Sequence, residues 1–78
     1  MKNNLYVISM DASTCCDYWD MDVIVVAPNY EDAKLYAADQ FNEVFKVKPS
    51  SIQLLQAIPF DKLKVGTAFI ISLDKGSK

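Results

Sequence analysis

The chain of 78 residues contains neither arginine nor histidine, and it has only two glycines and two cysteines. Without histidine it lacks the usual proton shuttle at neutral pH and the commonest metal ligand. Without arginine it lacks the side chain that holds phosphate or carboxylate through two parallel hydrogen bonds. The two glycines are isolated, so there is no glycine-rich phosphate loop. These absences argue against most enzyme classes, and we expect no catalytic residues, no cofactor and no bound metal.

Long apolar runs are also missing. The run at residues 5–10 is shorter than a signal-peptide core, and no segment approaches the ~20 residues that cross a bilayer. Cys15 and Cys16 are adjacent, so a disulfide between them would close a small, strained ring. We therefore expect a cytoplasmic protein with two reduced thiols and no membrane segment.

What the sequence does contain is enough apolar side chain, 51% of the residues, for one small core. Val- and Ile-rich segments predict strands at residues 5–10, 21–27, 52–58 and 67–73. Residues 59–66 should connect the last two strands, and residues 74–78 should fray.

A helix is predicted over residues 30–45. Asn29 can cap its first turn, and Pro49 ends it, because proline disfavours a helical conformation for the residue before it. Apolar side chains recur at intervals of three and four residues, which indicates one buried stripe. The stripe comprises Ala33, Ala37, Phe41, Val44 and Phe45.

The order β-β-α-β-β in a single domain, residues 1–78, predicts an α+β fold. It should have two layers, a four-stranded, mainly antiparallel sheet with the helix packed on one face. The strands are apolar on both sides, with Val23 facing away from Ile24, and Ile70 facing away from Leu73. One helix covers one face only, so the other face is covered either by the segment 11–20 or by another chain, and homodimerisation through it is one alternative.

Residues 11–22 form the most unusual segment, because acids, two thiols, a tyrosine and the only tryptophan occur there together. We expect residues 11–20 to form a long loop between the first two strands. Large rigid aromatic side chains surrounded by acids are typical of a surface that recognises a basic partner. The alternative is that Tyr18 and Trp19 close the end of the core while the aspartates keep the loop solvated.

Charge is distributed unevenly along the chain. Residues 1–40 carry a net charge of −5 and residues 41–78 carry +3. An acidic region of this kind favours a protein with a basic surface as partner. The partner-binding residues predicted from the sequence are Asp11, Asp17, Tyr18, Trp19, Asp20, Asp22, Glu31 and Asp32.

Other ligands fit the pattern less well. Asp17, Asp20 and Asp22 could hold a divalent cation, but their spacing is not that of an EF-hand loop. The lysines have no arginine and no aromatic platform among them, which argues against nucleic-acid binding. A module that binds a small ligand or a divalent metal remains the alternative to a protein-binding module, together with a structural homodimer.

Several segments resemble small uncharacterised proteins encoded by bacteriophages and other mobile elements. The similar features are YVIS at residues 6–9, the acidic aromatic segment, VVA at 25–27 followed by NYEDA at 29–33, and LQAI at 55–58 with FIIS at 69–72. The resemblance covers most of the chain and implies no catalytic residues. It implies a phage protein that acts as an inhibitor, of the anti-CRISPR kind, or as an adaptor on a host defence or nucleic-acid-handling protein.

Overall fold

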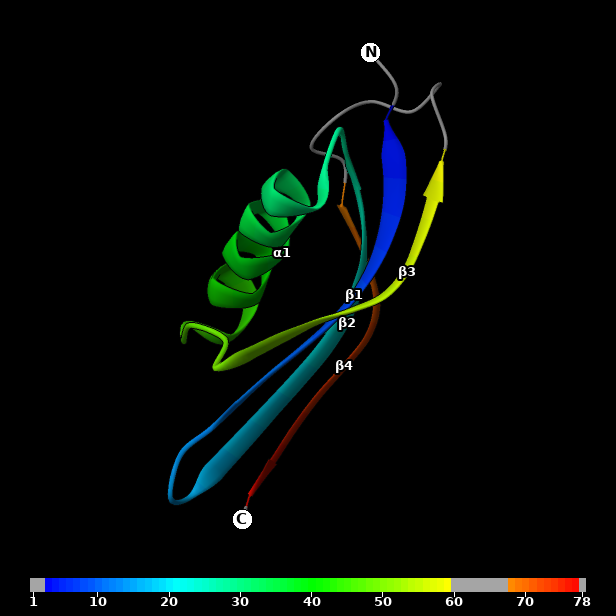
Figure 1. Cartoon of the computed structure of the whole chain (residues 1–78). Helices are drawn as coiled ribbons and strands as arrows, with labels where there is room; N and C mark the ends of the chain where they lie inside the picture. The colour runs from blue at the N-terminus through cyan, green and yellow to red at the C-terminus, as the bar shows by residue number, and fades with distance from the viewer. Residues whose placement is uncertain (1–2, 60–67, 78) are drawn as a thin grey trace.

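The computed structural model describes residues 3–59 and 68–77, which form four strands and one helix. In chain order these are β1 (Asn4–Ser13), β2 (Asp17–Ala27), α1 (Tyr30–Phe45), β3 (Ser51–Pro59) and β4 (Ala68–Ser77). The strands form one antiparallel sheet in the order β3-β1-β2-β4, and α1 lies against one face of it (Figure 1). The predicted α+β fold is confirmed.

The prediction of a loop over residues 11–20 is wrong. Residues 11–13 belong to β1 and residues 17–20 belong to β2, so the turn comprises residues 14–16 alone. The two strands form a long hairpin that extends well past α1 (Figure 1). The strands continue because Ala12 and Trp19, which are paired in the register, keep apolar side chains on the core side of the sheet. No long loop is therefore available here to cover the second face.

β4 is also longer than predicted at its C-terminal end. Residues 74–77, which were expected to fray, pair with the start of β2 from Asp20 down to Asp17. The long β2 supplies hydrogen-bonding partners for them, so the strand persists to Ser77. The connection was predicted over residues 59–66, but Pro59 belongs to β3. The other residues of that connection, residue 67 and residue 78 lie outside the described residues.

α1 begins and ends where the sequence predicts. The Asn29 side chain accepts a hydrogen bond of 2.9 Å from the amide of Asp32, which satisfies one of the free donors at the helix start. At the other end Lys46 adopts a left-handed conformation, with φ of 62°, and its amide donates to the Asn42 carbonyl at 2.8 Å. This closes the helix before Pro49 is reached.

The core lies between α1 and one face of the central strands. Ala33, Ala37 and Phe41 of α1 are fully buried, whereas Val44 is 38% exposed. The small alanines let α1 approach the sheet closely. The buried cluster on this face comprises Tyr6, Ile8, Met10, Ala12, Trp19, Met21, Val23, Val25, Ala27, Ala33, Ala37 and Phe41.

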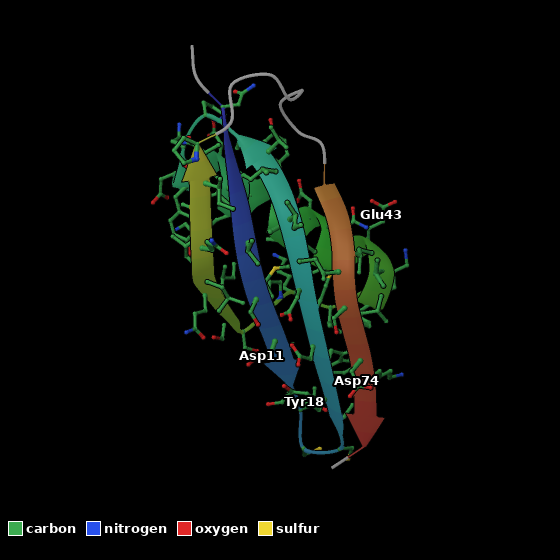
Figure 2. All side chains as sticks on the ribbon, turned by 90° about the vertical axis from the view of Figure 1, so that its right-hand side faces the viewer. Asp11, Tyr18, Glu43 and Asp74 are labelled. Atoms are coloured by element: carbon green, nitrogen blue, oxygen red, sulfur yellow. The ribbon has the colours of Figure 1, made fainter. Side chains whose placement is uncertain are left out.

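In the part of the chain that the structure describes, no helix lies on the opposite face of the sheet, which faces the viewer in Figure 2. We call this the helix-free face. By strand alternation it presents Leu5, Val7 and Ile24 at one end of the sheet and Asp11 and Asp20 at the other. Among the described residues there is no helix with the length and apolar character needed to cross a membrane.

Candidate functional site

Three aspartates from three adjacent strands lie side by side on the helix-free face. In the register Asp20 of β2 lies opposite Asp11 of β1 on one side and opposite Asp74 of β4 on the other. Neighbouring strands are about 4.8 Å apart, so the three residues span about 10 Å across the sheet. Figure 2 shows Asp11 and Asp74 at the same end of this face. We call Asp11, Asp20 and Asp74 the acidic row.

Asp74 was not among the residues predicted from the sequence, and a β-bulge explains why. The register of β2 with β4 shifts between Asp22 and Val23, which leaves Ile71 as the extra residue on β4. Without the shift, Ile70 and Asp74 would lie on the same face, because they are four residues apart on one strand. The shift places Ile70 opposite the buried Val23 and Asp74 opposite Asp20. It also corrects the expectation for Leu73, which lies opposite the buried Met21 and thus shares the core face with Ile70.

Asp22 and Tyr18 extend the acidic row along β2. Both lie two residues from Asp20 and therefore share its face, with Asp22 between Ser9 and Ser72 of the neighbouring strands. The pKa of the Tyr18 hydroxyl is raised, and the largest cause is partial burial. The negative charges of Asp20 and Asp11, a hydrogen bond with Asp20 and the charge of Asp74 raise this pKa further. Tyr18 thus lies within the field of all three carboxylates.

The acidic row is costly to the fold. Like charges directly opposite each other on adjacent strands are destabilising, by roughly 0.2–1 kcal/mol per pair. Asp20 takes part in two such pairs, because its register partner on each side is an aspartate rather than a lysine. The result is a compact cluster of negative charge on the sheet.

Trp19 lies on the other side of the sheet from its neighbours Tyr18 and Asp20. Its side chain is 7% exposed and belongs to the buried cluster. The Lys75 ammonium group, from the paired position on β4, lies 5.7 Å from the centre of the indole ring. The structure therefore separates Trp19 from the acidic row and supports the alternative in which this residue closes the end of the core.

Asp17 lies at the hairpin turn, where its backbone makes the closing contacts. Its amide donates to Thr14 Oγ1 at 3.0 Å, and its carbonyl accepts from the Thr14 amide at 2.8 Å. Alternation along β2 places its side chain on the side of Trp19 rather than of Asp20. At the same turn, a hydrogen bond with Cys15 and, to a smaller extent, burial raise the pKa of the Cys16 thiol.

Glu31 and Asp32 are remote from the acidic row. They lie in the first turn of α1, beyond the end of β2 at Ala27, and Ala27 is seven residues from Asp20, about 23 Å along a strand. The Glu31 carboxylate pairs with the Lys34 ammonium group at 3.3 Å. Both acids favour the positive end of the helix, which accounts for them as helix-stabilising residues.

The sequence analysis also left open a site for a divalent metal or a small ligand. In the part of the chain that the structure describes, no group of three or more Asp, Glu or Cys side chains is arranged to hold a metal ion. A hollow of about 310 Å³ lies between α1 and the start of β3, away from the acidic row. Its lining is Ala38, Asp39, Asn42, Lys48, Pro49 and Ile52.

Of the eight predicted partner-binding residues, the structure thus brings together Asp11, Tyr18, Asp20 and Asp22 and adds Asp74. A comparison of the chain with protein-family models, curated proteins and solved structures found no match.

Proposed function

We propose that this chain is a non-enzymatic protein-binding module whose helix-free sheet face engages a basic surface of another protein. The observation that carries the proposal is the acidic row, in which Asp20 lies between Asp11 and Asp74. The asparagine side chain has nearly the same shape without the charge and would relieve the repulsion. An arrangement that costs folding stability is expected where function requires it.

The chemistry of this face fits a cationic protein surface. Closely spaced carboxylates accelerate association with a partner of opposite charge and fix its orientation. Tyr18 adds a large, rigid side chain with a hydroxyl group, of the type enriched at protein interfaces. Leu5, Val7 and Ile24 lie on the same face towards the other end of the sheet and are only partly buried, so they offer apolar contact beyond the charges.

A second copy of this chain suits the face less well than a basic partner does. Two copies meeting through it would bring two acidic rows into one interface. Like charges that face each other across an interface cost several kcal/mol. The charge on the face therefore favours a heterologous partner over the homodimer.

The resemblance to phage proteins supports a more specific role. A small acidic module of this kind would act in the cytoplasm of a bacterial host, as an inhibitor of or an adaptor on a defence protein or a nucleic-acid-handling protein. Proteins that bind nucleic acid carry basic surfaces, and an array of carboxylates can occupy them in place of phosphates.

Affinity capture from bacterial lysate tests this role. The wild-type chain is compared with Asp20→Asn/Asp74→Asn and with Asp39→Asn/Glu43→Gln, which removes the same charge from α1. Glu43 lies on the helix behind the sheet in Figure 2, away from the acidic row. We expect the first double variant to lose a captured basic protein and the second to retain it. Equal capture by both would assign the binding to another surface.

A further inference from the structure

The tip of the β1–β2 hairpin carries two thiols that no part of the proposed function uses. Cys15 and Cys16 are both free and exposed, and their sulfur atoms lie 3.2 Å apart. Figure 1 shows this tip at the end of the molecule opposite the start of α1. Because both cysteines are exposed, small ligands can reach their sulfur atoms.

Thr14 holds the backbone of the pair in place. Its hydroxyl oxygen accepts hydrogen bonds from the amides of Cys16, at 3.3 Å, and Asp17, at 3.0 Å. The amide of Thr14 closes the turn by donating to the Asp17 carbonyl at 2.8 Å. The two sulfur atoms therefore lie on a turn that hydrogen bonds hold in one conformation, which lowers the entropic cost of binding one ligand through both.

The distance between the two sulfur atoms indicates which metal or metalloid atom could bind both of them. An atom bonded to both at about 2.3 Å, the length of a zinc–sulfur bond, would have an S–M–S angle of about 90°. A tetrahedral zinc ion requires sulfurs about 3.8 Å apart at that bond length, and a linear two-coordinate ion requires about 4.6 Å. Trivalent arsenic and antimony carry a lone pair that compresses their bond angles towards a right angle, so they match the observed separation.

A direct disulfide suits the pair less well. It would bring the sulfurs from 3.2 Å to about 2.05 Å and close a small ring around a planar peptide bond, which stores strain. A chelated atom enlarges that ring by one member and leaves the sulfurs at the separation they already have.

We propose that Cys15 and Cys16 form a bidentate dithiol site for a trivalent arsenic-type ligand. With an organoarsenic oxide, two sulfur–arsenic bonds form and the arsenic–oxygen bond breaks. The oxide oxygen leaves with the two thiol protons as one molecule of water, and no atom changes its oxidation state. Such a ligand is uncharged, so it approaches the acidic hairpin without repulsion.

Intact-protein mass spectrometry with phenylarsine oxide tests the site. The reduced wild-type chain should gain one phenylarsenic group, lose two hydrogens and keep the adduct in excess 2-mercaptoethanol, whereas ethane-1,2-dithiol should remove it. Cys15→Ser and Cys16→Ser each leave one thiol. In 2-mercaptoethanol, each serine variant should retain the arsenical less than the wild type by a factor on the order of 100, because it cannot form the second, intramolecular sulfur–arsenic bond.

Two further arms make the result decisive. Thr14→Val removes the hydroxyl that braces the turn and should weaken the adduct several-fold, and an unchanged adduct would contradict preorganisation by the turn. Zinc chloride added to the adduct should leave it intact. The proposal is overturned if either serine variant retains the arsenical as well as the wild type, or if zinc displaces it and joins two chains.

Discussion

Asp20 of β2 lies directly opposite Asp74 of β4, and both residues belong to the face of the sheet that α1 leaves open. Asp11 lies at the corresponding position on the other side of Asp20. Asp74 is exposed and Asp11 and Asp20 are partly exposed, and together they form a line of charge that no single strand could present. The fold therefore converts acids from distant parts of the sequence into one surface, at a cost in stability.

Removing the central charge should stabilise the fold. Asp20→Asn relieves both like-charge pairs, and we expect the free energy of unfolding to rise by about 0.2–1 kcal/mol for each pair. Urea denaturation at low ionic strength measures the change, which should shrink in high salt because screening already weakens the repulsion. Asp39→Asn is the control, since Asp39 lies on α1 outside the acidic row. A less stable Asp20→Asn variant would contradict the cost assigned to the row.

Tyr18 should titrate above the ordinary tyrosine range. Partial burial and the carboxylates of Asp20, Asp11 and Asp74 all disfavour its phenolate and raise its pKa. The folded state thus holds this proton more tightly than the unfolded chain, whose tyrosine pKa is about 10. The resulting stabilisation is complete below that pH and is lost as the pH rises through the folded pKa.

Ultraviolet titration of tyrosinate absorbance measures this pKa. The difference between the wild type and Tyr18→Phe isolates the Tyr18 component, which should move to lower pH in Asp20→Asn. A Tyr18 midpoint at or below about 10 would be inconsistent with the geometry of the row.

The fluorescence of Trp19, the only tryptophan, should report on the end of the core nearest the β1–β2 hairpin turn. Because Trp19 is buried and the Lys75 side chain covers its ring, its fluorescence should be blue-shifted and weakly quenched by acrylamide. Lys75→Ala should expose the ring and increase quenching, whereas Lys75→Met keeps an apolar stem over it and should quench less. Quenching of the wild type as strong as that of free tryptophan would place Trp19 at the surface instead.

The cap of α1 should contribute measurably to stability. Asn29→Ala removes the side-chain acceptor of the Asp32 amide and should lower the free energy of unfolding by about 1 kcal/mol. Asn42→Ala makes the same chemical change at an exposed position inside the helix and should be neutral or slightly stabilising. Urea denaturation of the two variants distinguishes the cap from helix propensity, and equal stabilities would show that the cap contributes nothing.

The helix could be predicted because its signals are local. The Asn29 cap and the spacing of Ala33, Ala37 and Phe41 all lie within a few turns of one another, and the structure contains the same helix, α1. No pairing with a distant segment was needed to recognise it.

The sequence analysis did not predict the length of the β1–β2 hairpin, although the sequence contains a pattern that indicates it. Trp19, Met21 and Val23 alternate with Asp20 and Asp22, which is the pattern of a strand with one buried face. The density of acids favoured a loop instead. In the structure, burial of the alternate side chains outweighs the poor strand propensity of aspartate.

The acidic row itself could not be predicted, because it depends on non-local pairing. Asp74 joins Asp20 only through the strand order and through the bulge at Ile71, which reverses the alternation along β4. Alternation read along the sequence places Asp74 on the same face as Ile70, and a bulge leaves no clear signature in these residues.

Binding to a defined basic probe tests the central claim most directly. Fluorescence anisotropy with a labelled arginine-rich peptide is measured for the wild type, Asp20→Asn/Asp74→Asn and Asp39→Asn/Glu43→Gln, two variants of equal net charge. If the acidic row is the binding surface, the first variant should lose affinity by roughly tenfold or more, while the second stays close to the wild type. Equal losses in both variants would mean that net charge alone attracts the peptide, and the assignment of the helix-free face would be wrong.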